Sequence, residues 1–220
     1  MDRTLGASKV MNIVEPSYEM LSHTINIEQL IEQCGRVCYK SEANIDEDSY
    51  IKFIEHIKSN HHESVLEHNA ITVKIVCDRG VSHELVRHRL ASYSQESTRY
   101  CNYTKGKFNR SITVVDIASG FKYDLTKPMD IKKYNIWKSA IMMAESHYFE
   151  LIALGATPQE ARSVLPNSLK TEIIVTANVR EWRHILKMRT SDSAHPQIRE
   201  VMQPILANFK LRWFTLFGDL

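Results

Sequence analysis

The sequence predicts an α+β fold, in a single domain over residues 1–220 whose mixed or antiparallel sheet is flanked by long helices. Two observations predict it. Segments with helical periodicity and segments with β-branched alternation are mixed along the chain, and they do not repeat as regular βαβ units. No internal repeat, low-complexity tract or linker divides the 220 residues, a length that suits one large domain.

The first part of the chain is predicted to contain two amphipathic helices and two strands. Residues 9–15 favour a short edge strand. Apolar residues at helical spacing predict a helix over residues 26–39, and a second helix starts from residue 47 with acidic residues in its first turn. Alternation of apolar and polar residues over 70–78 predicts a strand that Gly80 ends.

The middle of the chain combines short elements with one long helix. Residues 81–89 predict a short helix, and residues 101–129 are polar and irregular apart from a strand expected within 111–117. Residues 130–155 show the clearest helical periodicity, with Asp130 placed to cap the start and Gly155 the end.

The last third alternates helices with one strand. Residues 157–166 begin as a helix with Thr157 as its cap and stop at Pro166. Residues 170–179 are β-branched and predict a strand, residues 180–189 a short helix, and a final helix, bent near Pro204, runs from residue 197.

The composition is that of an ordinary soluble globular protein, with 43% hydrophobic residues, 25% charged residues and a net charge of +2. Proteins that bind DNA or RNA usually carry a stronger positive bias, so any basic patch here is local. The chain has no run of about 20 apolar residues and no apolar signal-peptide core. We therefore expect a cytoplasmic protein, with its cysteines as reduced thiols.

An arginine-rich stretch, RHRLASYSQESTRY (residues 87–100), gathers cations and hydroxyls. In an extended or turn segment Ser97 and Arg99 face one way, and a hydroxyl beside a guanidinium suits a phosphate monoester. Glu84 and Gln95 flank the stretch and can hydrogen-bond a sugar or a base edge. The residues alone leave three interpretations open: a pocket for a phosphorylated small molecule, a solvated junction in which Glu84 pairs with Arg87, and an RNA-binding strip.

Other candidate sites are weaker taken singly. The seven glycines form neither a G-x-G-x-x-G nor a Walker loop, so side chains would have to hold a nucleotide. HHESVLEH (residues 61–68) fits neither zincin pattern, because one pattern needs a histidine at position 66, which is leucine, and the other at position 64, which is serine. We therefore predict no metal site. His62, Ser64 and Glu67 are then polar loop residues beside a pocket, or capping groups.

Three further arginines stand in suggestive positions. Arg162 precedes an apolar segment, Asn178 and Arg180 close a β-branched run, and Arg189 ends a predicted helix. Each has a structural explanation, such as the favourable interaction of a cation with a helix C-terminus.

Together these segments resemble the flavin-dependent thymidylate synthases. RHR, seven residues and a serine run from Arg87 to Ser97 and continue as Thr98-Arg99-Tyr100, as in the signature of that family. HHESVLEH is similar to its H-x-x-x-x-E-H segment, ARSVLP to its A-R-x-x-L-P, and TANVREWRHILKMR to its N-x-R helix with a late arginine. The four segments occur in the family's order over most of the chain.

The resemblance implies the reductive methylation of dUMP to dTMP. FAD would be the cofactor, with NADPH and 5,10-methylenetetrahydrofolate as co-substrates. It also implies a homotetramer in which FAD and dUMP bind where subunits meet, with no nucleic-acid or membrane partner.

The resemblance also assigns residues by matching position. Arg189 would be catalytic, lying against the uracil ring and helping to ionise its N3, while Ser97 and Arg99 would lie near the phosphate. The dUMP site would contain Glu84, Leu85, Val86, Arg87, Gln95, Glu96, Ser97, Thr98, Arg99, Arg162 and Arg189. The FAD site would contain Cys38, His62, Ser64, Glu67, Arg87, His88, Arg89, Gln95, Asn178, Val179, Arg180 and His184.

The chain departs from the common family pattern at three positions. Ser94-Gln95 stands in place of Asn-Glu, Cys38 in place of a serine near FAD, and His184 in place of an asparagine. Gln95 can still donate and accept hydrogen bonds but brings no charge.

Uracil C5 can be activated by a cysteine that adds at C6, or by cations that stabilise charge at N3 and O4. Arg87 and Arg189 favour the second route, and Cys101 is the alternative nucleophile. A nucleic-acid-binding module and a flavoprotein reductase without methylation are the rival functions.

Overall fold

The computed structural model of the chain describes residues 11–104 and 111–220, which form two compact units. The first unit comprises the chain up to Pro16, Cys77–Ser82 and Gln95–Thr171, and the second comprises Ser17–Val76, His83–Ser94 and Glu172–Leu220. The mixture of helices with an antiparallel sheet confirms the predicted α+β class, whereas the single domain over residues 1–220 stays a prediction.

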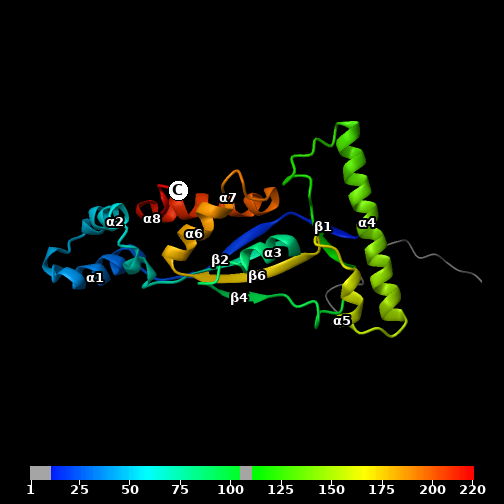
Figure 1. The fold of residues 1–220 in the computed structure, drawn as a ribbon, viewed down its shortest axis with the longest axis horizontal. Helices are drawn as coiled ribbons and strands as arrows, with labels where there is room; N and C mark the ends of the chain where they lie inside the picture. Colours follow the sequence, from blue (N-terminus) through cyan, green and yellow to red (C-terminus); the bar gives the residue numbers. More distant parts are fainter. Residues whose placement is uncertain (1–10, 105–110) are drawn as a thin grey trace, which may run out of the picture. The chain divides into compact units, whose positions relative to one another are not determined.

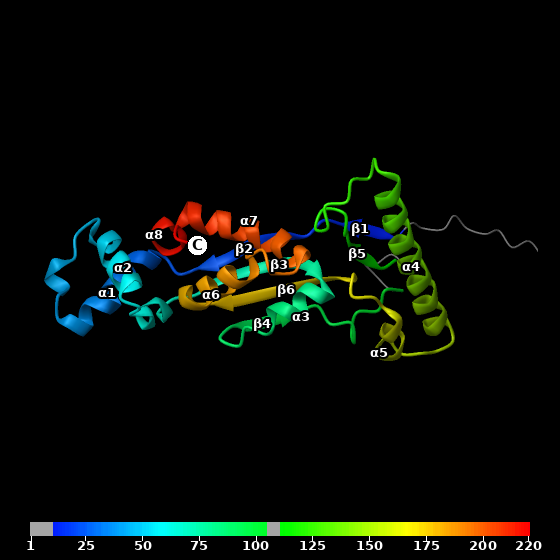
Figure 2. The ribbon, with the colours of Figure 1, turned by 45° about the horizontal axis from the view of Figure 1, so that its top comes forward.

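A four-stranded sheet has the strand order β2-β3-β6-β4 (Figure 2). Its strands are β2 (Ser17–His23), β3 (Ile71–Asp78), β6 (Lys170–Ala177) and β4 (Ser92–Gln95). Strands β2 and β3 are antiparallel. In β3 and β6 every second side chain is buried, as the alternating sequences require.

Side chains link the two central strands. The hydroxyls of Thr72 and Thr176 are 2.9 Å apart, and Lys74 Nζ lies 2.7 Å from Glu172 Oε2. The order of the partners reverses between β3 and β6, which is the pattern of an antiparallel pair.

The helices of the second unit form two groups. In both views α1 (Ile27–Tyr39) and α2 (Ser49–Ser59) lie side by side, and a short 3-10 turn at Glu63–Glu67 follows them (Figures 1 and 2). The other group is α6 (Val179–Arg189), α7 (Pro196–Arg212) and α8 (Phe214–Phe217).

Aromatic packing joins α6 to α7. Trp182 is fully buried, donates its indole N–H to the Ile71 carbonyl, and packs edge-on against Phe209 with ring centroids 5.4 Å apart. This contact fixes one side of α6, the helix that carries most of the polar residues considered below.

The first unit is built around a long helix and a small parallel sheet. Strands β1 (Asn12–Val14) and β5 (Thr113–Val115) pair in parallel, and α4 (Pro128–Ala153) runs beside them (Figure 2). The short α5 (Pro158–Ala161) leads into a 3-10 turn at Arg162–Val164. The core of this unit contains Met11, Tyr103, Ile112, Val114, Ile141, Tyr148, Ala161 and Leu169.

The element predictions hold for the long periodic segments and for the strands within 9–15 and 111–117, although Lys9 and Val10 lie outside the described residues. Thr157 is confirmed as the N-cap of α5, where it forms a capping box with Glu160, whereas Leu154 is the C-cap of α4 and Gly155 follows it with a positive φ. Asp130 is not the cap of α4, because that helix begins two residues earlier at Pro128. Strands β2 and β4 were not predicted.

The strand predicted over 70–78 ends at Asp78, as expected, but Gly80 lies inside the helix that follows rather than between the two elements. Helix α3 spans Arg79–Leu85 and includes Gly80, since the Asp78 carboxylate accepts a 2.6 Å hydrogen bond from the Val81 N–H and satisfies the helix start. The helix then ends at Leu85, so the RHR segment lies in the turn after it rather than on the helix.

Among the helices of residues 11–104 and 111–220, none combines the length and the apolar character needed to pass through a bilayer.

The closeness of α1 and α2 depends on a glycine. A Cβ built on Gly35 would lie 2.6 Å from Phe53 Cε1. We expect Gly35→Ala to lower the free energy of unfolding by about 1–3 kcal/mol through overpacking, measured by urea denaturation. Helix propensity alone would predict the opposite sign. Gln33→Ala, at an exposed position of the same helix, is the control, and a stabilised Gly35→Ala variant would contradict the packing argument.

Candidate active site

Arg189, the last residue of α6, is anchored by three hydrogen bonds within the second unit. Its Nε donates to His88 Nε2 at 3.0 Å, one terminal nitrogen donates to Glu84 Oε2 at 2.8 Å, and the other donates to the Glu84 carbonyl at 3.0 Å. The Arg189 side chain is 13% exposed. The interpretation of a solvated junction required Glu84 to pair with Arg87. In the structure Glu84 pairs with Arg189 instead.

His88 lies in the turn after α3 and is buried. Tyr93 fixes this turn, because its hydroxyl lies 2.8 Å from the Leu85 carbonyl and 2.7 Å from the His88 carbonyl. Burial, followed by the positive charge of Arg189, lowers the pKa of His88 to about 4. The imidazole is therefore neutral at physiological pH.

The rings of His88 and His184 pack edge to face with centroids 5.3 Å apart. The carboxylate oxygen Oε1 of Glu181 lies 3.6 Å from His88 Nδ1. The ligand atoms of these three residues lie within 4.8 Å of one another, the spacing of a metal site. Because a guanidinium can only donate, Arg189 uses the lone pair on His88 Nε2 and the ring proton must be on Nδ1. In this arrangement the imidazole has no lone pair left for a metal ion.

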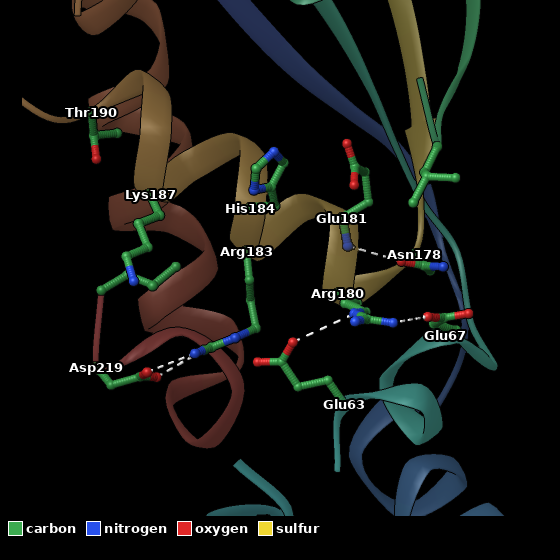
Figure 3. A pocket seen from close by; sticks show the side chains of 12 residues that line it. Glu63, Glu67, Asn178, Arg180, Glu181, Arg183, His184, Lys187, Thr190 and Asp219 are labelled. Carbon is green, nitrogen blue, oxygen red and sulfur yellow. Dashed lines mark hydrogen bonds and ion pairs between the residues drawn. The ribbon is translucent and has the colours of Figure 1, made fainter. Parts of the chain in front are cut away.

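A cavity of about 910 Å³ lies along one face of α6 (Figure 3). Arg180, Arg183, His184 and Lys187 recur on that face at helical spacing. The cavity is lined by Glu63, Glu67, Leu90, Asn178, Arg180, Glu181, Arg183, His184, Lys187, Thr190, Asp219 and Leu220.

Carboxylates hold two of these arginines. Arg180 is 2.6 Å from Glu67 Oε1 and 3.4 Å from Glu63 Oε2, and Figure 3 shows its guanidinium between them. Arg183 forms two hydrogen bonds to Asp219, which hold the pKa of that carboxyl well below its usual range. Among the described residues, Lys187 forms no ion pair, although the lining as a whole includes four side-chain carboxylates, those of Glu63, Glu67, Glu181 and Asp219.

A second cavity of about 430 Å³ shares Glu63 and Arg180 with the first. Cys38 and Tyr39 from the end of α1, and His62 and Ser64 from the turn before β3, line it. The structure therefore groups seven of the residues expected to contact FAD around two cavities of the second unit: Cys38, His62, Ser64, Glu67, Asn178, Arg180 and His184.

Five of the residues expected at dUMP lie in one segment of the first unit. Gln95 donates its amide to the buried hydroxyls of Ser82 (2.8 Å) and Thr171 (3.2 Å). Glu96 pairs with Lys170 at 3.1 Å. Ser97 Oγ accepts the Arg99 N–H in the following turn at 3.3 Å.

Arg162 lies against the same segment, with its guanidinium 3.3 Å from Thr98 Oγ1. The structure thus brings together residues 64 positions apart that the resemblance assigned to one ligand. The guanidinium of Arg99 lies 5.2 Å from the ring centroid of Tyr100.

The remaining expected residues differ in exposure. Leu85 and Val179 are buried in the core, so their side chains face away from solvent. Val86, Arg87 and Arg89 are exposed. Arg87 and Arg189 belong to the second unit and Arg99 and Arg162 to the first, and their convergence on one pyrimidine stays a prediction.

Sequence reasoning missed several residues of the larger cavity. Arg183 and Lys187 follow Arg180 by three and seven positions, so helical periodicity could have predicted that they share the face of Arg180. Glu181 and Asp219 carried no such signal, because the first looks like an ordinary first-turn acid and the second meets Arg183 only through the tertiary fold.

Comparisons with known proteins show which family the chain resembles. Residues 19–213 match the family model described as "Thymidylate synthase complementing protein". The flavin-dependent thymidylate synthase of Geobacter sulfurreducens is 34% identical over 208 residues, covering 91% of this chain and 84% of that protein. The enzyme of the same name from Pyrococcus furiosus is 34% identical over 194 residues, covering 86% and 74%.

The fold is also similar to a solved structure. The UMP/dUMP methylase PolB from Streptomyces cacaoi, bound with 5-Br dUMP, superposes with a TM-score of 0.78 at 22% identity, covering 94% of this chain and 96% of that one. The family model, the identities and the shared motifs agree: this chain belongs to the family of the flavin-dependent thymidylate synthases.

Proposed function

We propose that this protein converts dUMP to dTMP by reductive methylation, with FAD as the hydride source, NADPH as its reductant and 5,10-methylenetetrahydrofolate as the one-carbon donor. Family membership supports the reaction class. The observation that carries the proposal is the fixed Arg189 guanidinium, held by Glu84 and His88 in a poorly exposed position.

Arg189 is the proposed catalytic residue. A guanidinium has five N–H groups, and three of them bind Glu84 and His88, which leaves one on each terminal nitrogen. These two N–H groups are proposed to donate to N3 and O4 of uracil and stabilise the negative charge that activates C5. Donors fixed in advance are effective because they do not have to reorganise as charge develops.

The flavin is proposed to bind at the two cavities that share Arg180. Their volumes, about 910 and 430 Å³, lie within the usual range of roughly 300–1,000 Å³ for ligand pockets. The lining offers a dinucleotide polar side chains at Asn178, Ser64 and His62, and Arg180 and Lys187 would supply cations for its phosphates. When bound, FAD supplies the hydride.

The phosphate of dUMP is proposed to bind Ser97 and Arg99, with Arg162 beside them. Arg162 already contacts Thr98, and a hydroxyl next to arginines matches a phosphate monoester. The anchoring of Gln95 by two buried hydroxyls would hold this segment in a constant conformation.

We also propose a cytoplasmic homotetramer with sites shared between subunits. In the first unit, α4 carries an exposed apolar stripe that includes Ile131, Ile136 and Met143 and borders a shallow cavity of about 590 Å³. A stripe of this kind on a 26-residue helix is a suitable surface for a second copy of the chain.

The reaction can be tested on the purified protein. We expect flavin absorbance, a change in that spectrum when dUMP is added, and tritium release from C5-labelled dUMP in the presence of NADPH and methylenetetrahydrofolate. A yellow protein whose flavin spectrum does not change when dUMP is added would favour a flavoprotein reductase. A colourless protein that binds RNA with steep salt dependence would favour a nucleic-acid-binding module.

Arg189→Ala should lower kcat by roughly 10²–10³-fold, because the fixed donors at the pyrimidine are lost. Steady-state tritium release measures the change, and the midpoint of thermal unfolding shows whether the fold survives. Arg212→Ala removes an exposed arginine and is the matched control. Turnover at the wild-type rate in Arg189→Ala would rule out the catalytic role of Arg189. An inactive Cys101→Ser enzyme would favour the other route, in which a cysteine adds to C6 of uracil.

Arg99→Ala should raise the KM for dUMP roughly tenfold to a hundredfold, since a charge-assisted hydrogen bond contributes about 1.5–3 kcal/mol. Bound flavin, measured by its absorbance per protein, should stay close to wild type. Loss of flavin with an unchanged KM would move Arg99 from the substrate phosphate to the cofactor.

A further inference from the structure

We propose that Glu181 is a positioning residue: it holds the His88 imidazole in the orientation that lets His88 anchor Arg189. This inference rests on the proposed function, because it assigns Glu181 a role in orienting the guanidinium that would activate uracil. Glu181 was not among the residues that the resemblance assigned.

The geometry forms a continuous chain of four side chains. Glu181 Oε1 lies 3.6 Å from His88 Nδ1, His88 Nε2 lies 3.0 Å from Arg189 Nε, and Arg189 lies 2.8 Å from Glu84 Oε2. Glu181 and His88 are 6% and 5% exposed. One imidazole thus contacts side chains from both the first and the last turn of α6.

The proton positions follow from the donor types. Arginine can only donate, so His88 Nε2 must accept and Nδ1 must carry the proton. His88 Nδ1 lies 3.6 Å from Glu181 Oε1, slightly beyond hydrogen-bond distance, so the carboxylate attracts the ring N–H electrostatically. Rotation of the ring would therefore lose the hydrogen bond at Nε2 and the favourable electrostatic contact at Nδ1.

The surroundings keep this arrangement in one protonation state. Burial, Arg189, His184 and Arg87 all disfavour a charged His88 and lower its pKa to about 4. Burial raises the pKa of Glu181, while His184 and Arg180 oppose that rise. A neutral imidazole between a carboxylate and a guanidinium accepts from one side and donates to the other, as the chain requires.

The local backbone supports both ends. The Asn178 side chain caps α6 by accepting a 2.9 Å hydrogen bond from the Glu181 N–H, and this bond fixes the backbone position from which the Glu181 side chain extends. Tyr93 holds the carbonyls of Leu85 and His88 and so fixes the turn that carries the ring. The remaining freedom of His88 is rotation of its side chain, which is the freedom that Glu181 restricts.

The test compares Glu181→Met, which keeps the length of the side chain but has no strong acceptor, with Glu181→Gln, whose amide oxygen can still accept. Glu55→Met, at an exposed position of α2, is the control. Long-range ¹H–¹⁵N spectra of the full chain without substrates should show wild-type His88 as the Nδ1–H tautomer, neutral down to about pH 4. Glu181→Met should free the ring to rotate away from Arg189, so that this contact no longer fixes the proton and mixed tautomers appear at His88. Glu181→Gln should retain the single tautomer.

Turnover provides the second measurement. Glu181→Met should lower kcat roughly tenfold to a hundredfold with little change in the KM for dUMP, because a misplaced catalytic group costs about that much. Glu181→Gln should recover most of the loss. In an Arg189→Lys background the same Glu181→Met change should cost much less, since the two residues act through one chain.

The outcomes separate the inference from the proposed function. An unchanged His88 tautomer in Glu181→Met would overturn the positioning role. A fold-loss of kcat from Glu181→Met that is as large in the Arg189→Lys background as in the wild type would overturn it too. A wild-type protein that does not methylate dUMP would contradict the proposed function, and the substrate-free spectra would still decide whether Glu181 holds His88.

Discussion

The site in the second unit depends on one poorly exposed guanidinium and on the partners that compensate its charge. Arg189 is poorly exposed, and its charge is compensated by Glu84, a residue 105 positions earlier in the chain. A buried charge without such partners would be strongly unfavourable. The hydrogen bonds that satisfy it also fix the end of α6 relative to the turn after α3, so stability and the orientation of the proposed catalytic group have the same physical origin.

The same principle applies along the cavity face of α6. Arg180 and Arg183 are each held by carboxylates, and both arginines are therefore positioned before any ligand binds. An anionic ligand has to compete with Glu67 and Glu63 for Arg180, whereas Lys187 has no competing carboxylate among the described residues. The cations of the cavity are thus held in place before a ligand binds, and a ligand needs strongly anionic groups to displace their carboxylate partners.

Local structure was predictable where the physical signal is local. The helix over residues 26–39 and the strand over 70–78 were predicted because the spacing of their apolar residues reflects which face is buried. The place of Gly80 inside α3 was not predictable from propensity, because the start of that helix is stabilised by the Asp78 side chain. Strand β2 escaped prediction because most of its residues are exposed and its alternation is weak.

The sequence alone determined the α+β class, the family and the candidate residues, because short-range periodicity and motif spacing are properties of the chain itself. The tertiary structure decided which charges meet. Glu84 has Arg87 as its sequence neighbour but pairs with Arg189, and Glu181 faces His88 from another part of the chain. Partners separated by about a hundred residues are chosen by packing and by the cost of leaving a buried charge unpaired, and no local pattern encodes that choice.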